Sequence, residues 1–263
     1  MGRAIAEQLK SEYHVYVFDK DNTKTAGLTG IEIAQNISDL LVGADTLVLA
    51  VKPQDFKSLL EEIRDHVRDK LIITIAAGIS TAGIERILGE VRVVRVMPNM
   101  PAKIRKGMSC LSKGMFASDQ DLEFAESLFR EVGETLVIKE NMMGFATATS
   151  GSGPGLLCDL IQGKSMEEAR NFTERDFIPK LAAAANALGF SAGEAKLLAE
   201  TTARGTIEYL ESKHLSAEEV KKQVASPEGT TEAGLKKLGR NIKNLDAALK
   251  AAAVRAQELS KGL

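Results

Sequence analysis

One segment, Ala146-Thr147-Ala148-Thr149-Ser150-Gly151-Ser152-Gly153-Pro154-Gly155, separates two halves of the sequence that differ in character. Upstream, apolar runs of strand length alternate with helical patterns, whereas downstream nearly every pattern is helical. The glycines of the segment allow a close approach of the backbone to a ligand, because no Cβ intervenes. Pro154 suits the first turn of a helix, and the free amides of a helix start attract anions. The alternative interpretation of such a Ser/Gly-rich run is a flexible linker.

The composition is that of an ordinary globular protein of 263 residues, with 44% hydrophobic and 27% charged residues. A formal net charge of −2 gives no reason to expect a nucleic acid or an anionic membrane as a partner. No apolar run reaches bilayer length and no signal-peptide pattern opens the sequence, so we expect a cytoplasmic protein. Cys110 and Cys158 are too few for a disulfide framework, and His14, His66 and His214 lack ligand spacing, so we expect no metal site.

The first half predicts an α/β domain over residues 1–145, with a doubly wound and mainly parallel sheet. Strands that alternate with helices are typical of this architecture. The chain opens on a helix over residues 2–9 and only then enters its first strand. Strands are predicted at residues 14–19, 46–51, 71–76, 91–96, 108–112 and 135–138, with helices at 38–42, 54–67, from Ser80 to Leu88 and between Ser118 and Gly133.

The second half, residues 146–263, predicts an all-helical domain. Ser165, Ser191 and Ser216 are each followed three residues later by Glu, which is the capping-box pattern of a helix start. Alanine-rich amphipathic helices without a sheet cannot easily bury their apolar faces in one small lobe, so we expect an obligate homodimer built by residues 155–263. The stripe on the last helix indicates core or dimer packing and consists of Ile242, Leu245, Leu249 and Ala253.

Three loops stand out as candidate binding elements. Two follow predicted strands, Ala50-Val51-Lys52-Pro53-Gln54 and Arg95-Val96-Met97-Pro98-Asn99-Met100-Pro101, and the carboxyl edge of an open α/β sheet is where ligands bind. The third, Ser226-Pro227-Glu228-Gly229-Thr230-Thr231, opens a helix whose hydroxyls and amides could hold a carboxylate. Taken singly, each loop could equally be a rigid turn or a helix cap.

The three loops and Ser150-Gly151-Ser152-Gly153-Pro154 match the motifs of a known enzyme family, and they occur in the same order along the chain. The chain resembles the pyrroline-5-carboxylate reductases across almost its whole length. The resemblance implies reduction of 1-pyrroline-5-carboxylate to L-proline with NADPH or NADH, the last step of proline biosynthesis. It also implies a dinucleotide-binding domain, followed by a helical dimerisation domain that builds homodimers and often larger rings of dimers.

The resemblance also implies residue roles. Thr231 would be the catalytic residue that hydrogen-bonds the substrate nitrogen, with Ser226, Gly229 and Thr230 forming the cradle for the substrate carboxylate. Holding substrate and cofactor in reactive geometry would be the main catalytic effect. The residues expected to bind the cofactor are Gly2, Asp19, Lys20, Asn36, Ala50, Val51, Lys52, Pro53, Ala76, Met97, Pro98 and Asn99.

The choice between NADP and NAD stays open. Asp19 at a strand end suits a ribose 2′-hydroxyl and favours NAD. Lys20, Asn22 and Lys24 could instead bind the 2′-phosphate of NADP, which the family often uses.

The sequence departs from the family pattern in three places. Met1-Gly2 matches the end of a Gly-x-Gly-x-Met-Gly fingerprint, so we expect a first strand about 8 residues long upstream, or a distorted domain that binds dinucleotide poorly. Residues 156–176 are longer than the pattern, and Pro179 predicts that the following helix starts near it. Glu228 stands where a glycine is expected, and its carboxylate would repel the substrate unless it points outward.

Two alternative functions remain open at this stage. One is a two-domain reductase of the β-hydroxyacid dehydrogenase type, which would need a catalytic lysine such as Lys180 or Lys196 in the helical half. The other is a non-catalytic, oligomeric relic that has lost its cofactor but kept its helical dimer.

Overall fold

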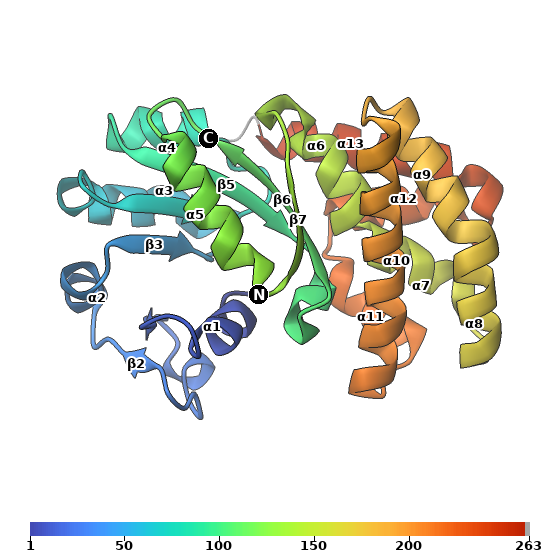
Figure 1. Cartoon of the computed structure of the whole chain (residues 1–263), viewed down its shortest axis with the longest axis horizontal. Coiled ribbons are helices and arrows are strands. Elements are labelled where there is room, and N and C mark those ends of the chain that lie inside the picture. The colour runs from blue at the N-terminus through green and yellow to red at the C-terminus, as the bar shows by residue number, and fades with distance from the viewer. Residues whose placement is uncertain (261–263) are drawn as a thin grey trace.

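The computed structural model describes residues 1–260, and it places an α/β part beside a bundle of helices (Figure 1). The α/β part contains α1 (Gly2–Leu9), β1 (Tyr16–Val17), β2 (Glu32–Ile33), α2 (Ile37–Gly43), β3 (Thr46–Leu49), α3 (Pro53–Ile63), β4 (Leu71–Thr74), α4 (Thr81–Leu88), β5 (Arg92–Pro98), β6 (Gly107–Lys113), α5 (Asp119–Arg130) and β7 (Gly133–Val137). The helical part contains α6 (Met143–Ala146), α7 (Gly153–Ile161), α8 (Met166–Phe172), α9 (Ile178–Ala187), α10 (Ala192–Lys213), α11 (Ala217–Val224), α12 (Thr230–Leu238) and α13 (Leu245–Leu259).

The main sheet has the strand order β3-β4-β5-β6-β7. β3, β4 and β5 are mutually parallel, β6 is antiparallel to β5, and β7 is parallel to β6. The predicted mainly parallel sheet is therefore confirmed, and the antiparallel step at β6 is a feature that the sequence did not indicate. The short turn from Met100 to Ile104 reverses the chain between β5 and β6, which explains that step.

The strand predicted at residues 14–19 is confirmed in position but is shorter than predicted, because β1 contains only Tyr16 and Val17. It pairs in parallel with β2, a strand that the sequence did not predict, and the two form a separate small sheet. Within residues 1–260, β1 and β3 do not pair with one another. Within residues 1–260, β2 is the one strand that pairs with β1, so no second neighbouring strand lengthens β1.

Helices cover both faces of the main sheet, as the doubly wound prediction requires. Successive residues of β4 point to opposite faces, so Ile72 and Ile73 join different cores. Ile72 packs in the core that contains Phe56 of α3, whereas Ile73 packs in the core that contains Phe129 of α5. Figure 1 shows α5 crossing one of these faces.

The helix starts that the sequence predicted are confirmed by their caps. Each of the cap serines accepts a hydrogen bond from the backbone amide three residues later, which satisfies one orphan donor of the first turn. In four of them the residue at that third position returns a bond to the serine. The five caps are Ser80, Ser118, Ser165, Ser191 and Ser216.

The cap of α5 supports a prediction about pH. Asp121 accepts hydrogen bonds from the Ser118 amide at 2.8 Å and from Arg92 at 2.8 Å. Burial alone would raise the pKa of Asp121, but the bonds from Ser118 and Arg92 outweigh it and lower that pKa below its usual range. A lowered folded-state pKa stabilises the protein above the unfolded value of about 3.9, and the stabilisation is lost as pH falls through the folded value.

We therefore expect Asp121→Asn to lower the free energy of unfolding by about 1 kcal/mol at pH 7. The difference from the parent should shrink as the pH falls below about 4 and vanish once the pH has passed the lower folded-state pKa of Asp121, because the parent carboxyl is then protonated as well. Urea unfolding at pH 7, 5 and 3 measures this, with Asp119→Asn as an exposed control in the same first turn. A difference that grows toward low pH would contradict the assignment.

The predicted helix start near Pro179 is confirmed, because α9 begins at Ile178 with Pro179 in its first turn, although the chain enters α9 from α8 through a π turn over Thr173–Phe177. Pro179 has no amide hydrogen to donate to the carbonyl four residues earlier, and the wider π turn removes the need for that bond. The Thr173 hydroxyl also bonds the Ala169 carbonyl at 2.7 Å. Residues 156–176 thus comprise the end of α7, a short connection over residues 162–165, α8 and most of this π turn.

The apolar stripe of the last helix belongs to the core of its own chain. Leu245 and Leu249 of α13 are fully buried, and Ile242 packs against the same core from the preceding turn. α13 packs chiefly on α12. No helix within residues 1–260 is long and apolar enough to cross a membrane.

Candidate functional site

The carboxyl ends of β3, β4 and β5 lie side by side along one edge of the main sheet. Leu49 is in register with Thr74, and Thr74 is in register with Arg95. Ala50 and Ala76 therefore occupy neighbouring positions just beyond their strands. Ala76 is held there by its amide, which donates to the Thr74 hydroxyl at 3.2 Å. The structure thus brings two of the expected cofactor residues to the same edge.

The start of α1 meets the end of β3 at this edge. A Cβ on Gly2 would lie 2.7 Å from the Cβ of Ala50, so a side chain at position 2 would push the helix away. The first-turn amides of α1 have no partner inside the helix. They form a donor set beside the sheet edge that fits the diphosphate of a dinucleotide.

The loop after β3 leads directly into α3. Lys52 is the N-cap residue, and Pro53 occupies the first turn, which agrees with the sharp exit expected from its fixed φ. Val51, Lys52 and Pro53 are exposed, so their surfaces are open to a ligand at the same edge as Ala50.

Met97 and Pro98 lie in β5 rather than in a loop, which corrects the sequence interpretation. They pair in register with Cys110 and Ser109 of β6. Asn99, which follows them, is only 2% exposed. Its amide nitrogen donates to the Ser150 carbonyl at 3.3 Å, and its amide oxygen accepts from the Met108 amide at 2.9 Å. Asn99 therefore ties the sheet to the Ser/Gly segment, and its contact with a cofactor stays a prediction.

The Ser/Gly segment is a buried helical connection, so the flexible-linker interpretation is wrong. A π turn over Thr147–Gly151 runs from α6 into α7, and Pro154 occupies the first turn of α7 as predicted. The Thr147 hydroxyl donates to the Met143 carbonyl at 2.8 Å, and the Ser150 hydroxyl donates to the Ala146 carbonyl at 3.0 Å. These side chains satisfy backbone carbonyls that the widened turn exposes.

Two glycines of this segment serve close helix packing. A Cβ on Gly153 would lie 2.6 Å from the Cγ2 of Thr202, and a Cβ on Gly155 would lie 2.6 Å from the Cγ2 of Thr231. The absence of these Cβ atoms brings α7 against α10 and α12. Gly155 therefore fixes the position of the residue expected to be catalytic.

The third candidate loop forms the start of α12. Gly229 is the N-cap residue, and its amide closes a turn by donating to the Ser226 carbonyl at 3.0 Å. A Cβ on Gly229 would lie 2.3 Å from the Ser226 Oγ, so a side chain there would displace the serine. The Ser152 hydroxyl donates to the Thr230 Oγ1 at 3.1 Å, a contact that the sequence did not predict. Because Oγ1 accepts this bond, the Thr230 proton is free to donate elsewhere.

Thr231 combines burial with an available hydroxyl. It is 4% exposed, and within residues 1–260 the structure shows no hydrogen bond to its hydroxyl. The start of α12 therefore presents free amides, the Thr230 proton and an unpaired Thr231 hydroxyl together, which is a suitable arrangement for an anion that carries a hydrogen-bonding nitrogen.

The same loop contains a strained residue at Glu228. Its φ is +57°, in the left-handed region where a glycine would be at ease. Its amide donates to a carboxylate oxygen of Glu232 at 2.7 Å, and its carbonyl accepts from the Arg255 Nε at 2.7 Å. The side chain of Glu228 is exposed, so its backbone holds the turn.

We expect Glu228→Gly to raise the free energy of unfolding by about 1 kcal/mol, because the substitution relieves the left-handed strain and keeps both backbone bonds. Denaturant unfolding measures the change. His214→Gly is the matched control, because His214 has a φ of +51° at the end of α10, and it should give a similar gain. A loss of stability in Glu228→Gly alone would show that the carboxylate itself holds the turn.

Three more of the residues expected to bind the cofactor, Asp19, Lys20 and Asn36, lie in the loops that adjoin the small sheet. Asn36 caps α2 by accepting from the Asp39 amide at 2.9 Å. Asp19 accepts from the Asp21 amide at 2.9 Å and lies 3.8 Å from the Lys24 ammonium. Lys20 is exposed.

Arg3 is a residue that the sequence reasoning missed. Its guanidinium donates to the Lys24 carbonyl at 3.1 Å and to the Ala26 carbonyl at 3.0 Å. It therefore joins the start of α1 to the loop after β1. A basic residue directly after Gly2 was the one signal available for this contact.

The two thiols are not reactive groups. Cys110 and Cys158 are both buried and free, and burial raises the pKa of each to about 12. A thiol with such a pKa is not a nucleophile near neutral pH. In residues 1–260 no group of three or more His, Cys, Asp and Glu side chains is placed to hold a metal ion.

Known proteins similar to this chain cover nearly its whole length. A family model described as pyrroline-5-carboxylate reductase dimerisation matches residues 176–262, and one described as NADP oxidoreductase, coenzyme F420-dependent, matches residues 1–78. The pyrroline-5-carboxylate reductase of Pseudomonas aeruginosa is 33% identical over 249 residues, which cover 93% of this chain and 85% of that protein.

Two solved structures have the same architecture. A pyrroline-5-carboxylate reductase from Coxiella burnetii is 31% identical with a TM-score of 0.63, and the match covers 98% of this chain and 94% of that one. An NADP-bound pyrroline carboxylate reductase from Plasmodium falciparum is 25% identical with a TM-score of 0.62, and the match covers 99% of this chain and 94% of that one.

Proposed function

This chain belongs to the pyrroline-5-carboxylate reductase family, and we propose that it reduces 1-pyrroline-5-carboxylate to L-proline with NADPH or NADH at the edge between the sheet and α12. The observation that carries the assignment of the site is the place of Thr231, which is 4% exposed and stands in the first turn of α12, and whose hydroxyl makes no hydrogen bond within residues 1–260. A cyclic imine with a carboxylate has the two groups that this place can bind.

The substrate carboxylate binds at the start of α12. The free amides of the first turn and the Thr230 hydroxyl donate to it, while Ser152 orients the Thr230 oxygen by donating to it at 3.1 Å. Ser226 stands beside Gly229 in the same turn. Glu228, which is exposed, adds a negative charge to this loop and disfavours binding unless its side chain stays in solvent.

The Thr231 hydroxyl holds the imine nitrogen. A hydrogen bond to this nitrogen fixes the ring and favours its protonated form, in which the adjacent carbon accepts hydride most readily. When bound, the nicotinamide cofactor supplies that hydride. Gly2, Ala50, Lys52, Pro53, Ala76 and Met97 would hold the cofactor along the sheet edge.

The alternative reductase type gains no support from the helical part. Lys180 forms an ion pair with Asp246, which leaves it bound to a structural partner, and Lys196 is exposed on α10. A lysine that acts as a general acid or base needs a position inside a substrate pocket and a pKa shifted by burial. Neither lysine fulfils the first condition.

We further propose that the chain forms a homodimer, in which residues 155–263 build the interface, and that dimers assemble into a larger ring. The match of residues 176–262 to a dimerisation family supports this interface. The same proposal divides the chain into a dinucleotide-binding domain of residues 1–145 and a helical domain of residues 146–263, and it places the protein in the cytoplasm. Light scattering at micromolar concentration tests the dimer, and a monomer there would contradict it.

Cofactor binding separates an active enzyme from an oligomeric relic. Titration of the protein into NADPH, and separately into NADH, should quench or enhance the nicotinamide fluorescence with micromolar affinity. A higher affinity for NADH would indicate that Asp19 determines the cofactor preference, and a higher affinity for NADPH would indicate that Lys20 and Lys24 do. The absence of any fluorescence change with both cofactors, in a folded dimer, would support the relic.

A further inference from the structure

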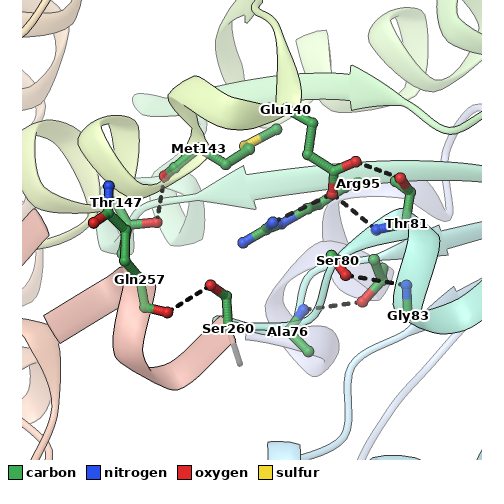
Figure 2. Close-up of polar contacts among 11 residues, drawn as sticks. Ala76, Ser80, Thr81, Gly83, Arg95, Glu140, Met143, Thr147, Gln257 and Ser260 are labelled. Atoms are coloured by element: carbon green, nitrogen blue, oxygen red, sulfur yellow. Dashed lines mark hydrogen bonds and ion pairs between the residues drawn. The ribbon is translucent and has the colours of Figure 1, made fainter. Parts of the chain in front are cut away.

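A cavity of about 230 Å³ lies between the sheet part and the helical part, outside the site described above. Figure 2 shows its polar side chains, which come from the loop before α4, from β5, from the turn before α6 and from the end of α13. It is lined by Ser80, Arg95, Glu140, Asn141, Gln257 and Ser260, among others. None of these residues belongs to the proposed substrate cradle at α12.

Arg95 dominates this cavity, because it is a buried cation with most of its donors unused. The residue is 6% exposed, and its Nη1 donates to the Glu140 Oε1 at 3.3 Å. A guanidinium has five N–H donors. Within residues 1–260 this long contact is the one hydrogen bond that the Arg95 guanidinium makes, and Figure 2 shows part of the guanidinium extending away from Glu140.

Glu140 compensates this cation only in part. Its Oε1 also accepts from the Thr81 amide at 2.8 Å, and its Oε2 accepts from the Thr81 hydroxyl. The carboxylate is therefore fixed to the start of α4, and its contact with Arg95 is longer than the 2.7–2.9 Å typical of a charge-assisted bond. Burial lowers the pKa of Arg95, although Glu140 acts to raise it.

The rest of the lining combines polar side chains with small residues at positions 144 and 256. The Ser80 Oγ accepts from the Gly83 amide at 3.0 Å, so its proton is available to the cavity. Asn141 and Gln257 contribute amide groups, and the Gln257 side chain lies against the glycine at position 144. A planar fork of N–H groups matches a carboxylate. A single negative charge is favoured over a double one, because Glu140 repels it from one side.

We propose that this cavity is a binding site for a small organic carboxylate, which Arg95 holds and which joins the sheet part to α13. Ser80 and Arg95 lie on one side of the bound anion, and Gln257 on the other. The loop after β4 already touches the end of α13, since a Cβ on Gly78 would lie 3.1 Å from the Leu259 Cβ. An anion in the cavity therefore stabilises the contact between the two parts. The proposal does not depend on the catalytic assignment.

Thermal unfolding of the full chain with added salts tests the proposal. At constant ionic strength, sodium acetate and sodium propionate should raise Tm by about 2–4 °C in a saturable manner. Sodium chloride should not raise it. Inorganic phosphate should raise Tm less than acetate, because of its second charge. An equal response to acetate and phosphate would overturn the carboxylate class, and an equal response to acetate and chloride would overturn the site.

Gln257→Glu supplies the carboxylate from the chain itself. We expect this variant to melt above the parent without added anion and to lose the response to acetate. Gln223→Glu makes the same change at an exposed position of α11 and should keep the parent's response. Gln257→Leu, which removes the amide but adds no charge, should weaken acetate binding several-fold. A full acetate response in both position 257 variants would refute the site.

Discussion

Thr231→Ala should lower kcat about 100- to 1,000-fold, which corresponds to the loss of a transition-state hydrogen-bond donor worth ~3–4 kcal/mol. The reason is the position of the hydroxyl, which stands in the first turn of α12 and makes no hydrogen bond within residues 1–260. The loss in free energy of unfolding should be small, about 1 kcal/mol, because the substitution breaks no hydrogen bond within residues 1–260. Steady-state kinetics and denaturant unfolding on the same preparation measure both quantities.

Thr231→Ser is the matched control for this variant. It keeps the hydroxyl and removes only the Cγ2 methyl that contacts Gly155. We expect it to keep kcat within a few-fold of the parent. If Thr231→Ala unfolds much more easily than the parent and yet keeps its specific activity, the threonine is a packing residue and the catalytic role is wrong.

Gly155→Ala should lower activity strongly without touching a reacting group. The new Cβ would lie 2.6 Å from the Cγ2 methyl carbon of Thr231, which is too close for two carbon atoms. α7 or α12 must move to admit it, at an expected loss of about 1–3 kcal/mol in stability. A misplacement of about 1 Å at Thr231 is enough to lower the rate about 100-fold.

The double variant Gly155→Ala/Thr231→Ser removes the methyl and should recover most of the lost activity, which a packing defect elsewhere would not do. Gly193→Ala tests the effect of an added methyl by itself, because no atom lies within 4 Å of a Cβ at that position in α10. It should be neutral or slightly stabilising. Equal activity in Gly155→Ala and Gly193→Ala would show that Gly155 does not position the site.

Local signals in the sequence were sufficient for most of the fold. The cap serines, the apolar runs of β3, β4 and β5 and the proline in the first turn of α7 are all found where the sequence predicted them. Each of these features depends on residues that are close together in the chain. For example, the cap at Ser118 needs only Asp121, three residues away, to close it.

Features that depend on distant residues were missed. Asn99 bonds Ser150, which lies 51 residues away, and Arg95 contacts Glu140, which lies 45 residues away. No periodicity or spacing shows that these pairs meet. The sequence left two interpretations of the segment over Thr147–Gly151 open for a related reason, because small polar residues are compatible with a flexible linker and with a buried helical turn, and burial decides between them.

The candidate site shows the same difference between features that depend on nearby residues and features that depend on distant ones. The sequence and its resemblance named Thr230 and Thr231, but they did not show that Ser152 orients Thr230 or that Gly155 fixes Thr231. Those contacts join α7 to α12, two helices that are far apart in the chain. The position of a catalytic hydroxyl is thus decided by packing that only the folded chain displays.

The most direct measurement of the central claim is NAD(P)H oxidation, followed by absorbance at constant protein, with 1-pyrroline-5-carboxylate as the substrate. We predict saturable oxidation of NADPH or NADH, with formation of proline in equal amount and near-complete loss of both in Thr231→Ala. A folded, dimeric protein that binds the cofactor and yet forms no proline would contradict the account.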